Sequence, residues 1–194
     1  PTATTSSTRK GAASSTWSGQ EWTCHAWSSD GKHESDSVSA SVVVTEQCFD
    51  TGPGEPNESE SEALDLGELG DNEDPKSFTA VIAGETDKDW YFFVGRDKAT
   101  GVMETGITID SGGVPIRVCY FAQCLNGLGK TEIECENGAT AINSPNGLPG
   151  CCSYASFDMD LNCADTLSDD AAMYIHAYSE MPDVCQPYEI SYSY

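Results

Sequence analysis

The sequence predicts an all-β protein whose main part is an antiparallel β-sandwich or jelly roll of about eight strands. Short segments of alternating or continuously apolar residues follow one another between turns rich in Gly, Asn and Pro, a pattern typical of short antiparallel strands. No segment shows a helical period over a useful length. The 194 residues include nine cysteines, as is typical of loop-rich folds that are held together by disulfides.

The charge balance excludes two classes of partner. The chain has 32 Asp and Glu against nine Lys and Arg, a formal net charge of −23. Nucleic acids and anionic membrane surfaces are bound through Lys and Arg, so we expect neither as a partner. No apolar run approaches the ~20 residues that cross a bilayer, so no membrane span is expected. The acidity instead suits a calcium-rich extracellular setting, and the alternative is a solvated acidic surface that serves solubility alone.

The cysteines indicate an oxidising compartment. The chain has no CxxC pair and only three histidines, which disfavours a zinc site and favours a disulfide framework. We therefore expect a secreted or cell-surface protein. No signal peptide is visible, and the chain begins with Pro1 rather than Met. These two observations predict a fragment of a longer, multidomain secreted protein.

The first region predicts two strands, at 21–28 and 37–44, joined by a turn at SDGK. The succession WTCHAW, SDGK and SVSASVVV resembles the last two strands of an immunoglobulin-like module. This resemblance implies that residues 1–47 are the C-terminal part of a truncated Ig-like domain. Cys24 would then lack its partner from an earlier strand. The alternative is a bridge between Cys24 and Cys48.

The second region begins after a linker and continues to the C-terminus. Residues 48–54 are rich in Gly and Pro and are predicted to be that linker. The domain that follows is expected to span residues 55–194. Its acidic opening, residues 55–75, is predicted to be mostly loop with a short helical turn around 59–64.

The rest of this domain divides into segments with strand character. In the segment YASFDMDLNC, alternation places Phe157, Met159, Leu161 and Cys163 inward. The segment DWYFFVG is apolar on both faces, which predicts a strand in the middle of the sandwich. The predicted strands lie within residues 76–84, 89–95, 101–112, 114–124, 131–138, 154–163, 171–178 and 187–194.

Eight of the cysteines are predicted to form four disulfides, whose connectivity the spacing leaves open. Cys151 and Cys152 are adjacent, so we expect them to bridge to different partners. A bridge between Cys124 and Cys135 would close the intervening NGLGKTE loop. The eight cysteines are Cys48, Cys119, Cys124, Cys135, Cys151, Cys152, Cys163 and Cys185.

Three motifs together resemble one family. They are EPNESESEA at 55–63, GETDKDWYFF at 84–93 and AAMYIHAYSEMPDVCQPYEISY at 171–192. In this order they resemble the bacterial pre-peptidase C-terminal (PPC) domain, and within it the collagen-binding domains of clostridial collagenases. The resemblance covers about residues 52–194, and the cysteine-rich stretch 119–163 departs from simple family members. It implies a non-catalytic extracellular β-sandwich for adhesion, for holding a polymeric substrate or for secretion.

The same resemblance implies a structural calcium site, because in the family the opening segment lies against the loop before the D-x-D strand. Calcium takes six to eight oxygen ligands, and the carried-over ligands are Glu55, Asn57, Glu58, Asp87 and Asp89. The alternative is that the EPNES segment is a solvated acidic tail and that the two aspartates only cap a turn.

A second candidate site is a surface for an extracellular polymer. In the strand at 171–178, Tyr174, His176 and Tyr178 share one face, while the other face is expected to belong to the core. In the collagen-binding relatives a tyrosine-rich sheet face contacts the ligand, which implies a ligand-binding stripe of these residues joined by Tyr188. The alternative is that this strand is buried on both faces.

Enzyme motifs are absent from the sequence. HExxH, GxSxG and a Cys/His nucleophile pair do not occur, so we expect no enzyme. Two other hypotheses remain open: a purely structural stalk or envelope module without a ligand, and a small all-β hydrolase. The hydrolase would need His176 in a cleft beside a serine or a carboxylate.

Overall fold

The computed structural model divides the chain into two compact units, Pro1–Gln47 and Cys48–Tyr194, each described by itself below. Among the described residues, no helix reaches the length and apolarity that a membrane span requires. The structure describes residues 21–27, 31–43, 48, 50, 52–98, 103–125, 130–164, 168–181 and 185–194.

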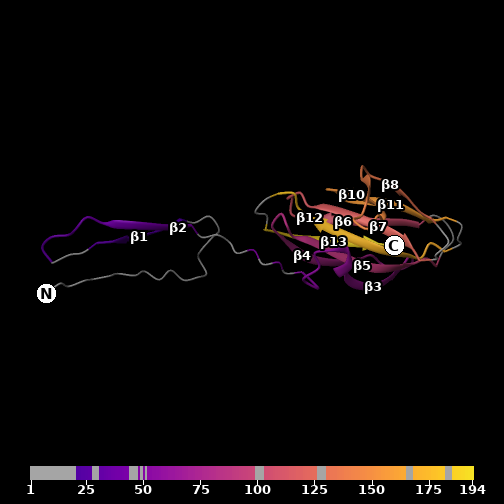
Figure 1. Ribbon diagram of the computed structural model, residues 1–194, viewed down its shortest axis with the longest axis horizontal. Helices are drawn as coiled ribbons and strands as arrows, with labels where there is room; N and C mark the ends of the chain where they lie inside the picture. The colour runs from indigo at the N-terminus through magenta and orange to yellow at the C-terminus, as the bar shows by residue number, and fades with distance from the viewer. Residues whose placement is uncertain are drawn as a thin grey trace. The chain divides into compact units, whose positions relative to one another are not determined.

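The first unit contains a two-stranded antiparallel sheet (Figure 1). Strand β1 (Glu21–Ala26) pairs with β2 (Val38–Val43), which confirms both predicted strands. Residues 1–20 and 28–30, which include part of the predicted SDGK turn, lie outside the described residues.

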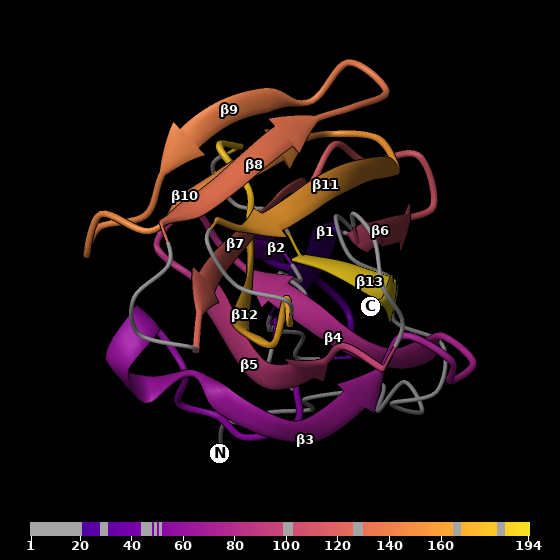
Figure 2. The same cartoon turned by 90° about the vertical axis from the view of Figure 1, so that its right-hand side faces the viewer.

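The second unit is a β-sandwich, as the sequence predicted (Figure 2). Its two sheets have six and five strands among the described residues, more than the eight expected. One sheet has the order β3 (Leu64–Gly70), β5 (Lys88–Arg96), β12 (Ala171–Tyr178), β7 (Arg117–Cys124), β10 (Pro149–Ser153) and β9 (Thr140–Asn143). The other has the order β4 (Lys76–Ala83), β13 (Cys185–Ser193), β6 (Met103–Asp110), β11 (Phe157–Cys163) and β8 (Thr131–Cys135).

The core lies between the sheets and follows from the period-2 alternation of the strands. In β11 the predicted set Phe157, Met159, Leu161 and Cys163 is buried and its alternate residues are more exposed. In β5 both faces are apolar. Its inner residues, Tyr91 and Phe93, join the main core, as do Tyr188, Ile190, Tyr192 and Tyr194 of the C-terminal segment. The outer residue Trp90 packs in a smaller cluster with Phe121 and the Cys119–Cys152 bridge.

All eight predicted cysteines form disulfides. The bridges are Cys48–Cys185, Cys119–Cys152, Cys124–Cys163 and Cys135–Cys151. Alternation explains the adjacent pair in β10: Cys151 points into the main core toward β8, and Cys152 points to the outer cluster toward β7.

Two suggested pairings are wrong. Cys124 bonds to Cys163 rather than to Cys135, so that bridge joins the two sheets instead of closing a local loop. The alternative partner for Cys24 is also excluded, because Cys48 bonds to Cys185.

The segment before the sandwich also differs from expectation. Residues 48–54 are not a free linker, since Cys48 is bonded to β13 and belongs to the second unit. The predicted helical turn is a 3₁₀ helix, η2 (Glu60–Glu62). Part of the predicted loop is the strand β3, which pairs in parallel with β5 and has a register shift between Asp65 and Glu68.

Candidate metal-binding site

The opening motif lies against the start of β5. The backbone N–H of Trp90 donates to the carbonyl of Asn57 at 3.0 Å. Two residues earlier in β5, the N–H of Lys88 donates to Glu58 Oε2 at 3.2 Å. Asp87 directly precedes β5 and Asp89 is its second residue, and the extended backbone turns both inward with Tyr91. The structure therefore brings together all five predicted ligands from segments about thirty residues apart.

Three of these side chains are deeply buried: Asn57 and Asp89 are fully buried, and Asp87 is 5% exposed. One oxygen of Asp87 accepts a hydrogen bond from the N–H of Ala83. Asp89 accepts a hydrogen bond from the hydroxyl of Tyr188. Burial of carboxylates at this depth is costly unless each finds a compensating partner.

Asp50 completes the cluster, and the sequence reasoning missed it. Carboxylate oxygens of Asp50, Glu55 and Asp89 lie within 4.8 Å of one another, and so do those of Asp50, Glu58 and Asp87. Asp50 thus belongs to both sets. The sequence carried no specific signal for it, because the Cys48–Cys185 bridge that holds the chain two residues before Asp50 is one of the pairings that the spacing leaves open.

Two oxygens in the cluster have no hydrogen-bond partner among the residues that the structure describes. They are Oδ1 of Asp50 and Oδ1 of Asp87, and both atoms are buried. An unsatisfied buried acceptor costs about 1–3 kcal/mol, more when it is charged. Such groups usually point to a bound ion or an ordered water.

Burial raises the pKa values of four carboxyl groups in the cluster. Burial, with Asp87 and Glu55 nearby, raises the pKa of Asp50 to about 7. Burial also raises the pKa of Asp89 to about 8, against the opposing hydrogen bond from Tyr188. Burial raises the pKa values of Asp87 and Glu58 as well. The cluster therefore takes up protons unless another positive charge is present.

The side chain of Asn57 has two possible orientations in this cluster. With its amide nitrogen toward the carboxylates, it donates to Glu55 Oε1 at 3.1 Å, Glu55 Oε2 at 3.0 Å and Asp89 Oδ1 at 3.3 Å. With its oxygen toward them, only acceptors face one another. The second orientation is favourable only when a cation lies between these oxygens.

The donor set is entirely oxygen, with several carboxylates on a buried framework. This is the chemistry of hard cations such as calcium, which accepts flexible coordination by six to eight oxygens. Lys88 lies between the two aspartates in sequence, but its side chain is exposed and no ion pair joins it to them among the described residues. The residues present therefore fit a calcium ion.

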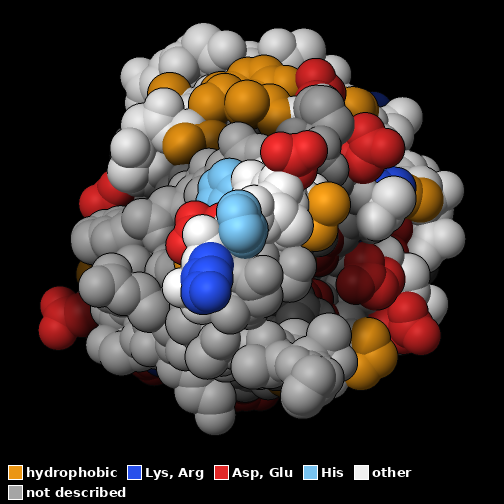
Figure 3. Space-filling model, turned by 90° about the vertical axis from the view of Figure 1, so that its left-hand side faces the viewer, with side chains coloured by type: hydrophobic (Ala, Val, Ile, Leu, Met, Phe, Trp, Pro, Cys, Tyr) orange, Lys and Arg blue, Asp and Glu red, His pale blue; other side chains and the backbone are white. Residues whose placement is uncertain are grey.

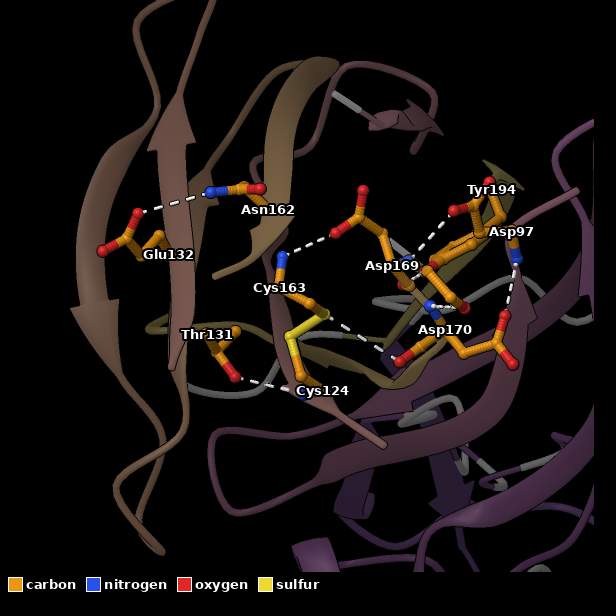
Figure 4. The surroundings of a disulfide bond; sticks show 10 residues. Asp97, Cys124, Thr131, Glu132, Asn162, Cys163, Asp169, Asp170 and Tyr194 are labelled. Carbon is orange, nitrogen blue, oxygen red and sulfur yellow. Dashed lines mark hydrogen bonds between the residues drawn. A yellow bond between two sulfur atoms is a disulfide. The ribbon is translucent and has the colours of Figure 1, made fainter. Parts of the chain in front are cut away.

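Two further carboxylates, Asp169 and Asp170 just before β12, have a different arrangement. Figure 4 shows them beside the Cys124–Cys163 bridge. Asp169 Oδ1 accepts from the N–H of Cys163 at 2.6 Å, and Asp170 Oδ1 accepts from the N–H of Asp97 at 2.8 Å. Both carboxylates accept hydrogen bonds from backbone N–H groups, and among the described residues neither belongs to a group of carboxylates that could hold a metal ion.

The predicted aromatic stripe is only partly accessible. Tyr174, His176 and Tyr178 do share the outer face of β12, and each is half-buried. The ring of His176 stacks on those of Trp90 and Tyr178, with ring centroids 4.1 Å and 4.7 Å apart, respectively. The inclusion of Tyr188 in an exposed stripe is wrong, because Tyr188 is 3% exposed and faces the core from β13 in the other sheet.

His176 lines a hollow of about 230 Å³ together with Glu58, Ser59 and Ser61 among others. Its Nε2 atom is buried and finds no hydrogen-bond partner within the described part of the chain. Burial lowers the pKa of His176 to about 3, far below the value near operating pH that suits a general base. The hollow thus has the histidine, serine and carboxylate lining that the hydrolase hypothesis named. The lowered pKa of His176 argues against a general base, and the hypothesis stays a prediction.

The chain is strongly acidic, with 32 Asp and Glu against nine Lys and Arg. On the side shown in Figure 3, many more acidic than basic side chains are visible among those coloured. Long-range attraction of a polyanion is correspondingly disfavoured.

Comparisons with known proteins identify no relative. No family model matches the chain, and no curated protein or solved structure matches it. The resemblance to the PPC domain is therefore carried by the quoted motifs alone.

Proposed function

We propose that the second unit is a non-catalytic extracellular module, stabilised by calcium, for adhesion, secretion or the holding of an extracellular polymer. The observation that carries this proposal is the buried carboxylate cluster around Asp50, Asp87 and Asp89. Its two unpartnered buried oxygens, on Asp50 and Asp87, are the feature that a solvated acidic tail would not produce.

The disulfides support the extracellular part of the proposal. Four disulfides connect cysteines between residues 48 and 185. Such a framework persists in oxidising compartments rather than in the cytosol. The two bridges Cys124–Cys163 and Cys135–Cys151 join the two sheets. Calcium is also abundant outside the cell, where weak sites are commonly occupied.

The proposal is tested by thermal melts of the whole chain with calcium and with chelator, and by calorimetric titration of calcium. At about 100 times its dissociation constant a ligand adds about 2.7 kcal/mol. In a domain of this size, about 1 kcal/mol shifts Tm by about 2–4 °C. We therefore expect chelation to lower Tm by roughly 5–11 °C.

A matched pair of variants locates the effect. Asp87→Asn removes a buried ligand charge and should abolish most of the calcium-dependent shift. Glu85→Gln removes the same charge from an exposed position in the same loop and should leave the shift intact. Identical melts with calcium and with chelator, and no heat of calcium binding, would contradict the proposal.

A further inference from the structure

A hollow lies at one end of the six-stranded sheet, outside the carboxylate cluster. It measures about 240 Å³ and is lined by Pro115, Tyr154, Glu180 and Met181. These residues come from three loops: before β7, after β10 and after β12. Tyr154 and Met181 are among the most exposed large apolar side chains of the second unit, at 48% and 45%.

The loops that carry Tyr154 and Met181 are held in the same way. The N–H of Ala155 donates to Ser153 Oγ at 3.1 Å, and the N–H of Met181 donates to Ser179 Oγ at 3.1 Å. Each serine follows or ends a strand of the sheet, so both side chains are presented from fixed turns. A surface that is already ordered loses less conformational entropy on binding.

Arg117 connects the hollow to the sheet. Its guanidinium donates to Glu180 Oε1 at 3.2 Å and lies 5.7 Å from the ring centroid of Tyr154 and 6.0 Å from that of Tyr178. Guanidinium groups lie over aromatic rings while their N–H donors, which point outward in the guanidinium plane, stay available for hydrogen bonds. The hollow thus combines a half-exposed aromatic ring, a thioether and a carboxylate, and the guanidinium of Arg117 lies beside it, against Glu180 and Tyr154.

We propose that this hollow binds one sugar ring of an uncharged polysaccharide. The apolar face of the sugar packs on Tyr154 and Met181, and its hydroxyls donate to Glu180 and accept from Arg117. Sites for drug-sized ligands measure roughly 300–1,000 Å³, so a hollow slightly smaller than these suits a single ring, with the polymer continuing along the surface.

Charge decides between this occupant and the alternatives. The chain carries a net charge of −23, which repels a polyanion. Within the hollow the charges of Arg117 and Glu180 pair with each other, so no net charge attracts a basic partner there. Hydroxyl groups can use the remaining donor and acceptor positions of both residues without separating them.

The test is native affinity electrophoresis of the whole chain in gels that contain glucomannan, galactomannan or hydroxyethyl cellulose. We expect at least one polymer to retard the protein, and raising the salt concentration should leave the retardation unchanged. Tyr154→Ala should weaken the affinity about tenfold, equivalent to about 1.4 kcal/mol, while Tyr154→Phe should retain it. Ile142→Ala removes an apolar side chain of similar exposure, 40%, and serves as the control.

Several results would overturn the proposal. The first is that none of the three polymers retards the protein, and the second is that Tyr154→Ala leaves the retardation unchanged. The others are binding to alginate alone that weakens with salt, and binding to insoluble gelatin alone. The inference rests on the proposed function only in treating the unit as a binding module. Tyr154-dependent retardation without any calcium effect would overturn the calcium site alone, and a calcium effect without retardation would overturn this surface alone.

Discussion

The Cys48–Cys185 bridge should control both the stability of the sandwich and the affinity of the carboxylate cluster for calcium. It ties the start of the second unit to β13. Asp50, which belongs to both sets of clustered carboxylates, lies two residues beyond Cys48. The perturbation is the double substitution Cys48→Ser with Cys185→Ser in the whole chain.

The expected loss of stability follows from the length of chain that the bridge closes. Cys48 and Cys185 are 137 residues apart, and the Cys124–Cys163 bridge shortens the path by 39 residues, to about 100. In the chain-entropy model a loop of about 100 residues corresponds to about 4.7 kcal/mol. At about 2–4 °C per kcal/mol, Tm should fall by roughly 9–19 °C.

The expected loss of calcium affinity follows from the release of Asp50. A hydrogen bond or contact to a charged group contributes about 1.5–3 kcal/mol. Because about 1.4 kcal/mol is a factor of ten, the dissociation constant for calcium should rise about 10- to 100-fold. Thermal melts and calorimetric titration of the same samples measure the two effects separately.

The control is Cys119→Ser with Cys152→Ser. This bridge joins two strands that are already paired, β7 and β10, and its cysteines contact the outer cluster of Trp90 rather than the carboxylates. It should lower Tm and leave calcium affinity unchanged. The reasoning is refuted if both double variants change calcium affinity equally, or if opening Cys48–Cys185 lowers Tm by less than opening Cys119–Cys152.

Two further predictions concern pH and the core. Burial raises the pKa values of Asp50 and Asp89 to about 7 and about 8 in the calcium-free folded state, so protonation of these groups stabilises that state. The stabilisation is complete below the unfolded pKa of 3.8 and is lost as pH rises through 7–8. The Tm increase caused by calcium should therefore grow between about pH 6 and about pH 9, and an increase that stays constant would contradict the shifted pKa values. Phe93 is fully buried and its ring lies 4.8 Å from that of Tyr192, so Phe93→Ala should cost about 3–5 kcal/mol in urea unfolding, whereas Ile142→Ala should change stability by no more than about 0.5 kcal/mol.

Alternation along single strands made most of the sandwich predictable. In β11 the inward set is apolar and the outward set is polar, so one strand determines its own register against the core. The same rule would have placed Tyr188 correctly, because Tyr188, Ile190 and Tyr192 alternate onto the same face of β13 and all three are buried. The prediction grouped Tyr188 with the tyrosines of β12 because of its residue type, and not with the alternating residues of its own strand, so it assigned Tyr188 to the wrong face.

Other features depend on neighbours that a single segment does not reveal. Strand β3 contains two glycines and acidic residues, which disfavour a strand locally, but the edge of β5 supplies its hydrogen-bond partners. Gly67, with φ of +89°, lies within its register shift, where a positive φ suits glycine. The bridge from Cys124 to Cys163 likewise depends on which strands of opposite sheets face each other, and spacing along the chain carries no such information.

The leading segment of the second unit touches both layers of the sandwich. Cys48 is bonded to β13 in one sheet, and Asn57 is hydrogen-bonded to β5 in the other. Between them, Asp89 of β5 accepts from Tyr188 of β13 across the sheets. A cation held by Asp50, Asp87 and Asp89 would therefore join the leading segment to the start of β5, and β13 would be linked to it through the hydrogen bond from Tyr188 to Asp89. This placement accounts for carboxylates at the start of an apolar strand, because their repulsion without a cation and their attraction with one both act where the two sheets and the leading segment meet.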